Sequence, residues 1–191
     1  MSVSIPSNDE IEDLILSCRY GDLDDIQHFV DCFGPDHLNN ARDDNGNTVL
    51  HMVCANGHAD ALDYLLPIIS PSLISAQNAA KSTPLHWAAL NSHISVAQKL
   101  VQYPAGPGAD LIDIKNAMGR SPLGEAENVG WEEGAKWFVK VMNLDEVGKG
   151  EEELQPVDEP DAIEVEIQDA EGQVAKMSLS NQVPDEDKHI T

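Results

Sequence analysis

A stretch of about a dozen residues recurs along this chain, and the recurrence limits the possible folds more than any other feature. NTVLHMVCANGH (residues 47–58) aligns with STPLHWAALNSH (residues 82–93) at a shift of 35 residues. RSPLGEAENVGW (residues 120–131) aligns with the second copy at a shift of 38, and a weaker copy, DLILSCRYGD, covers residues 13–22. Self-similarity at such a period predicts a solenoid, in which each unit buries its apolar side against its neighbours.

Each copy has the pattern of two short helices. When the copies are aligned, each has a leucine at one position, or column, and a glycine or its substitute at another. Apolar residues follow five, eight and nine positions after the glycine column. Glycine accepts the left-handed conformation that ends a helix. The leucine column is Leu14, Leu50, Leu85 and Leu123, and the helix-ending column is Gly21, Gly57, Ser92 and Gly130.

TPLHWAA at residues 83–89, the dipeptide Gly57-His58 and GAD at residues 108–110 resemble the ankyrin-repeat consensus. The resemblance covers residues 8–143 and implies an all-α solenoid of about four helix-pair units. The first unit lacks the TPLH start, and the last has Gly124 where the central units have histidine. Both departures suit capping units, whose outward sides meet water.

The chain is strongly acidic, with 34 acidic and 11 basic side chains and a formal net charge of −23. Nucleic acid is therefore not expected as a direct partner, because phosphates require basic neutralisation. A basic protein is the complementary partner, although acidity also serves solubility alone. Residues 145–191 carry 15 of the acidic side chains and no aromatic residue, which predicts an acidic, mostly disordered tail.

Within that tail, IEVEIQDAEGQVAKMSL (residues 163–179) begins with the alternation that is typical of a strand, and its AEG could form a turn. A segment that orders on a partner is one interpretation of this alternation. Chance alternation within a disordered tail is the interpretation favoured here, because an isolated hairpin is only marginally stable in water.

Several classes of function are not supported by the residues. Three cysteines without a CxxC pair fit a reducing compartment, and we expect a soluble intracellular protein because neither a signal-peptide pattern nor a membrane-spanning apolar run occurs. No Ser/His/Asp grouping, Walker loop or HExxH motif is present, so we predict neither an enzyme nor a cofactor or metal site. Cys18 and Cys54 are expected to be buried spacers. By the family resemblance, His51 and His86 should bond backbone in the neighbouring hairpin.

Trp87 identifies the surface on which a partner is expected. Its column, and the residues three and four positions further along each first helix, lie away from the buried columns. In the ankyrin family this side, together with the hairpin tips, forms the concave binding face. An aromatic anchor with an acidic rim suits a basic amphipathic segment, although Trp87 could instead pack against its neighbours. The predicted binding residues are Tyr20, Asp44, Asn47, Met52, Asn56, Trp87, Leu90, Asn91, Glu125 and Asn128.

A narrower resemblance comes from RYGDLDDI (residues 19–26) and MGRSPLGEAENVG (residues 118–130), together with the two central copies. These stretches are similar to the fungal ankyrin-repeat chaperones dedicated to ribosomal protein S-three of the small subunit. The resemblance implies a monomer that binds the basic N-terminal segment of its client one to one, keeps it soluble, and escorts it from the cytoplasm towards assembly in the nucleus. It implies no direct contact with nucleic acid or membrane. An adaptor or inhibitor that binds another basic protein is the alternative.

Overall fold

The computed structural model describes residues 5–149, 164–168 and 174–178 of the 191-residue chain. The chain divides into two compact units, residues 1–150 and 151–191. The expected repeat region, residues 8–143, lies within the first unit.

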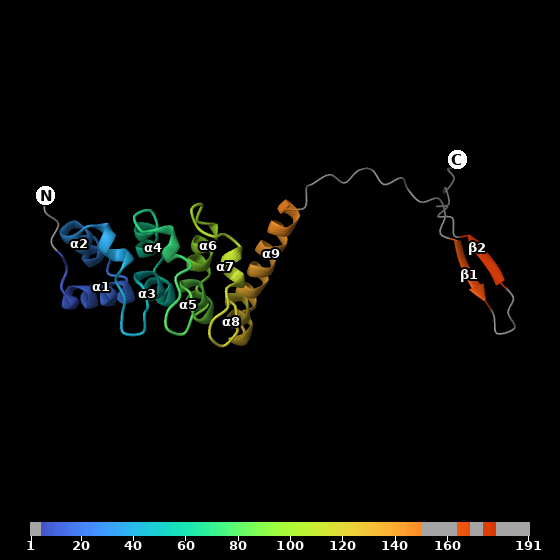
Figure 1. Ribbon diagram of the computed structural model, residues 1–191, viewed down its shortest axis with the longest axis horizontal. Helices are drawn as coiled ribbons and strands as arrows, with labels where there is room; N and C mark the ends of the chain where they lie inside the picture. Colours follow the sequence, from blue (N-terminus) through green and yellow to red (C-terminus); the bar gives the residue numbers. More distant parts are fainter. Residues whose placement is uncertain (1–4, 150–163, 169–173, 179–191) are drawn as a thin grey trace, which may run out of the picture. The chain divides into compact units, whose positions relative to one another are not determined.

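The first unit is a stack of four helix pairs arranged in two rows (Figure 1). One row holds the first helix of each pair: α1 (Asn8–Tyr20), α3 (Val49–Asn56), α5 (Pro84–Leu90) and α8 (Pro122–Asn128). The other holds α2 (Leu23–Phe33), α4 (Ala59–Leu65), α6 (Ile94–Gln102) and α9 (Glu132–Lys149). Each first helix packs on the next one along the chain, so the stack is held together by contacts between sequence neighbours.

Long connections between the pairs carry short helical turns. The 3-10 helices η1 (Pro35–Asn39) and η2 (Pro71–Leu73) follow the second helices of the first two pairs, and the one-turn helix α7 (Asp110–Asp113) follows α6. η2 lies in the connection between α4 and α5, and α7 lies in the connection between α6 and α8.

The recurring columns form the core. Leu14, Leu50 and Leu85 are buried, while Leu123 in the last pair is partly buried against the same cluster. The small residues beside them, including Cys18, Cys54 and Ala88, have no exposed surface. The predicted burial of both cysteines is therefore confirmed, and it raises the pKa of the Cys18 thiol to about 12.

Left-handed residues end the first helices, as the glycine column predicts. Gly57 has φ 75° at the end of α3, and its amide donates to the carbonyl of Val53. Ser92 takes the same conformation, with φ 61°, without glycine's freedom. A Cβ on Gly57 would lie 2.6 Å from Nδ1 of His93, so close packing between units also requires glycine at that position.

The second unit contains an antiparallel pair, β1 (Glu164–Gln168) with β2 (Val174–Ser178), in which Glu166 is opposite Lys176. Chance alternation was therefore the wrong interpretation for these two segments, because the alternating residues pair as strands. The AEG turn lies outside the described residues, and so does the expected disorder of the rest of the tail. Residues 145–149, which were expected to begin the tail, are the last residues of α9.

Candidate protein-binding surface

The two central units share a buried Thr–His arrangement that joins each unit to the next. The backbone N–H of Thr48 donates to Nδ1 of His51 at 3.1 Å, and Nε2 of His51 donates to the carbonyl of Ser82 at 2.9 Å. Thr83 and His86 repeat the arrangement, with Nε2 of His86 3.0 Å from the carbonyl of Arg120. The predicted bond from each histidine to the neighbouring hairpin is confirmed.

These bonds require neutral imidazoles, since Nδ1 accepts while Nε2 donates. Burial lowers the pKa of His51 to about 4 and also lowers that of His86. Among the described residues, no group of three or more His, Cys, Asp or Glu side chains is placed to hold a metal ion. The repeated histidines are thus structural groups that orient the hairpins.

Neighbouring hairpins are aligned by backbone bonds at their tips. The amide of Ala79 donates to the carbonyl of Asn45 at 2.9 Å, and the amide of Ala117 donates to the carbonyl of Ala80 at 2.9 Å. The side chain of Asn78 reaches across, with Nδ2 donating to Oδ1 of Asn47 at 2.7 Å. The tips therefore form one continuous edge along the row of first helices.

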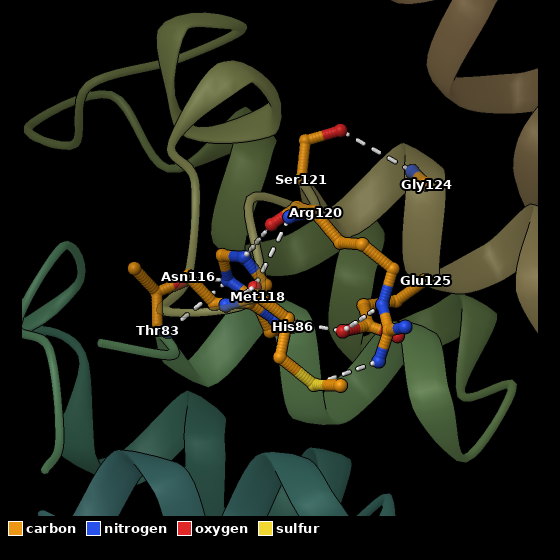
Figure 2. A network of polar contacts seen from close by, with 8 residues as sticks. All are labelled: Thr83, His86, Asn116, Met118, Arg120, Ser121, Gly124 and Glu125. Carbon is orange, nitrogen blue, oxygen red and sulfur yellow. Dashed lines mark hydrogen bonds and ion pairs between the residues drawn. The ribbon is translucent and has the colours of Figure 1, made fainter. Parts of the chain in front are cut away.

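Two of the predicted binding residues belong to this internal framework, and their side chains are buried. Asn47 is only 3% exposed, because its amide is held by Asp43 and Asn78. Glu125 is 1% exposed and accepts from Nδ2 of Asn116 at 2.7 Å. Nε of Arg120 lies 3.0 Å from Oε1 of Glu125 as an ion pair, while Oε2 is buried without a partner in the described part of the chain (Figure 2).

Of the other eight predicted residues, six are exposed, Trp87 is half-buried and Met52 is buried. Tyr20 is 74% exposed on α1, and five further predicted residues are also exposed. Trp87 is half-buried, with its ring edge-on to His51 at a centroid distance of 6.4 Å, so the indole is not sealed between units. Met52 is buried but lines a cavity of about 260 Å³ beside α1. The five further exposed residues are Asp44, Asn56, Leu90, Asn91 and Asn128.

The asparagines of this surface are anchored to backbone. Nδ2 of Asn91 donates to the carbonyl of Ala55 at 2.8 Å, which ties α5 to α3, and Nδ2 of Asn56 donates to the carbonyl of Met52 at 2.9 Å. The Oδ1 atom of each of these side chains makes no hydrogen bond to another described residue, so it can accept one from a partner.

Three exposed apolar residues, Leu16, Met118 and Val129, are absent from the predicted binding residues. Leu16 is 45% exposed and stands in the column of Met52 and Trp87, so the repeat alignment could have identified it. Met118 is 71% exposed at the tip of the last hairpin, where Nη2 of Arg120 donates to its sulfur at 3.1 Å. No periodic signal marks this position, because it lies in a turn. We define the inner-helix surface as Leu16, Tyr20, Met52, Trp87, Leu90 and Val129 with the polar side chains between them.

Comparison with known proteins agrees with this geometry. A family model described as ankyrin repeats in three copies matches residues 14–113. The chain belongs to the ankyrin-repeat family. This is not an enzyme family. None of the described helices has the length and apolar character needed to cross a membrane.

Two fungal ankyrin-repeat proteins and one solved structure are similar to the chain. It is 34% identical to the ankyrin repeat-containing protein P16F5.05c of Schizosaccharomyces pombe, over 75% of this chain and 91% of that protein. It is 30% identical to the ankyrin repeat-containing protein YAR1 of Saccharomyces cerevisiae, over 74% of each. A crystal structure of the yeast ribosomal protein Rps3 in complex with its chaperone Yar1 matches with a TM-score of 0.66 and 27% identity, covering 81% of this chain and all of that one.

Proposed function

We propose that this protein is a dedicated chaperone of ribosomal protein Rps3, the ribosomal protein S-three of the small subunit. The observation that carries the proposal is the match to the Rps3–Yar1 crystal structure, which covers the full length of the matched chain. The sequence likeness to YAR1 over 74% of each protein agrees with that match.

The charge of the protein fits such a client. A newly made ribosomal protein with a basic segment is attracted to any polyanion before it reaches its place on rRNA. A carrier with a net charge of −23 attracts the same segment at long range and competes with those contacts. Because exposed charges are screened by salt, this part of the binding should weaken as ionic strength rises.

The inner-helix surface would supply the short-range part of the interaction. Trp87 and Tyr20 offer aromatic surface, Leu90 adds an aliphatic contact, and Asn91 offers a fixed amide. Buried aromatic anchors contribute most of the energy in typical interfaces. Glu125 and Asn47 hold the hairpins behind this surface, and Asp44 stands exposed at a hairpin tip to attract basic side chains.

The proposal includes the route of the client. The chaperone is soluble, holds its client one to one in the cytoplasm and accompanies it into the nucleus. The chain contains no cluster of basic residues of the kind that nuclear import requires, so entry would depend on the client's own signal.

Co-purification tests this function. The chain and Rps3 from the same organism are co-expressed, and the complex is isolated at about 0.1 M and 0.5 M salt, a range over which exposed charges become strongly screened. We expect a one-to-one complex by native mass spectrometry, recovered in lower yield at the higher salt. Recovery of a signalling protein or transcription factor from cells, with no complex with Rps3, would replace the proposal with a regulatory adaptor.

A further inference from the structure

The N-terminal end of the stack contains a groove that the inner-helix surface does not account for. It lies between α1 and α2 and has a volume of about 540 Å³. Figure 1 shows α3 and α4 on one side of this helix pair and no described helix on the other. A cavity of this size accommodates several side chains of a bound segment.

The floor of the groove is apolar. Leu14, Phe29 and Phe33 line it, and the two phenylalanine rings lie 4.9 Å apart between centroids. Tyr20 and Leu16, which also line it, are exposed. A capping unit is expected to present a polar outer side to water. This one leaves aromatic and aliphatic surface open, which is the usual mark of an interaction site.

The rim of the groove is acidic. Glu10, Asp13, Asp22 and Asp25 line it, and residues 5–40 hold nine acidic side chains and one basic residue, Arg19. Glu10 accepts from Ser7, and Asp22 caps α2 by accepting from the amide of Asp25. Within the described residues, no hydrogen bond or ion pair engages the carboxylates of Asp13 and Asp25. Their charges are available to a ligand.

The acidic rim determines which kind of segment can occupy the groove. The chain's own residues 145–191 carry a net charge of −12 and a second copy carries −23, so both are repelled by an acidic rim. A cationic segment with apolar side chains matches both the rim and the floor. The groove is also continuous with the inner-helix surface, because Leu16 lines this groove as well as the cavity beside Met52.

We propose that the basic client segment extends beyond the inner-helix surface, passes over Leu16 and Tyr20, and inserts apolar and cationic side chains into the α1–α2 groove. This inference rests on the proposed function, since it assigns a second contact region to the same client. The first helix pair is then both the cap of the stack and part of the binding site.

The chain carries its own reporter for this contact. Cys32 is exposed and lines the groove, whereas Cys18 and Cys54 are buried. Burial raises the pKa of both buried thiols, so an alkylating reagent reacts with Cys32 alone in the folded protein. In the purified complex with Rps3, we expect the alkylation rate of Cys32 to fall about tenfold or more relative to the free protein, because access is lost.

A matched pair of variants tests the rim. Asp24 and Asp25 are both exposed and lie in the first turn of α2, but only Asp25 lines the groove. D25K should weaken client binding about fivefold more than D24K at low salt, since an exposed ion pair is worth up to roughly 1 kcal/mol. Circular dichroism checks that both variants are folded.

The outcomes separate the two proposals. If no complex with Rps3 forms, the proposed function fails and this inference fails with it. If the complex forms but Cys32 is alkylated at the free rate, the groove is empty and only the present inference is overturned. Equal affinities of D24K and D25K would overturn it in the same way, and the wild-type alkylation result stands even if a variant does not fold.

Discussion

Protonation of His51 should determine part of the pH dependence of stability, and the structure allows its size to be worked out. The imidazole is fully buried, and its pKa is lowered to about 4, mainly by burial. In the unfolded chain its pKa is about 6.5, so the unfolded state binds the proton more tightly. The stabilisation is therefore complete above pH 6.5 and is lost as the pH falls towards 4.

Linkage between these two pKa values gives the magnitude. Between pH 7 and pH 4.5, the free energy of unfolding should fall by about 2.4 kcal/mol through this single group. Carboxylates titrate in the same range, and in a protein with a net charge of −23 their protonation relieves repulsion. The contribution of His51 must therefore be read as a difference from a variant that lacks it.

His51→Gln is the suitable variant, because its amide can still donate to the carbonyl of Ser82 but does not titrate. Urea unfolding at pH 7 and pH 4.5 would measure the free energy of unfolding of both proteins. The variant should be less stable than wild type at pH 7, and the gap should shrink by about 2.4 kcal/mol at pH 4.5. A gap that stays the same at both pH values would refute the assignment of a neutral, buried imidazole. His86→Gln should show the same sign, since the pKa of His86 is also lowered.

Three further perturbations test the core, the binding surface and the second unit. Leu85→Ala should lower the free energy of unfolding by about 2 to 5 kcal/mol, because Leu85 is fully buried. A smaller decrease in the free energy of unfolding, measured by urea denaturation, would contradict the place of Leu85 in the core. Trp87→Ala should weaken binding of a basic Rps3 peptide about thirtyfold by calorimetry. The control Val139→Ala, also an exposed apolar site but on α9, should bind normally, and equal affinities would exclude Trp87 from the site. Deletion of residues 150–191 should leave cooperative melting by circular dichroism unchanged while slowing capture at low salt; loss of cooperativity would show that these residues belong to the repeat fold.

The helix pairs were predictable because local chemistry determines them. Apolar residues at helical spacing, a capping threonine before α3 and a left-handed glycine after it are all visible in the sequence. The role of His51 was also predictable, although only through the family resemblance.

The burial of Asn47 and Glu125 was not predictable from the repeat columns. Asn47 is held by Asn78, which lies 31 residues further along the chain, and Glu125 is covered through Asn116 and Arg120. Such contacts depend on how hairpins meet in space. Glu125 shares the helix column of Trp87, whereas Asn47 lies in a hairpin turn before α3, where helical spacing gives no guide. The pairing of β1 with β2 was undervalued for a related reason, because alternation in one strand does not reveal its partner.

Gly124 ends the series of histidine bonds that join one unit to the next. The imidazole bridges run one way, from the second unit to the third and from the third to the fourth, and the fourth has glycine where the next bridge would begin. Inserting a spare copy of the central unit after α6 would therefore lengthen the scaffold, since that copy brings its own histidine. If the same copy were added after α9, its junction with the fourth unit would lack the hydrogen bond from histidine to the neighbouring hairpin, because the fourth unit has Gly124 at that position. An extension made between existing units therefore keeps a histidine bond at each new junction.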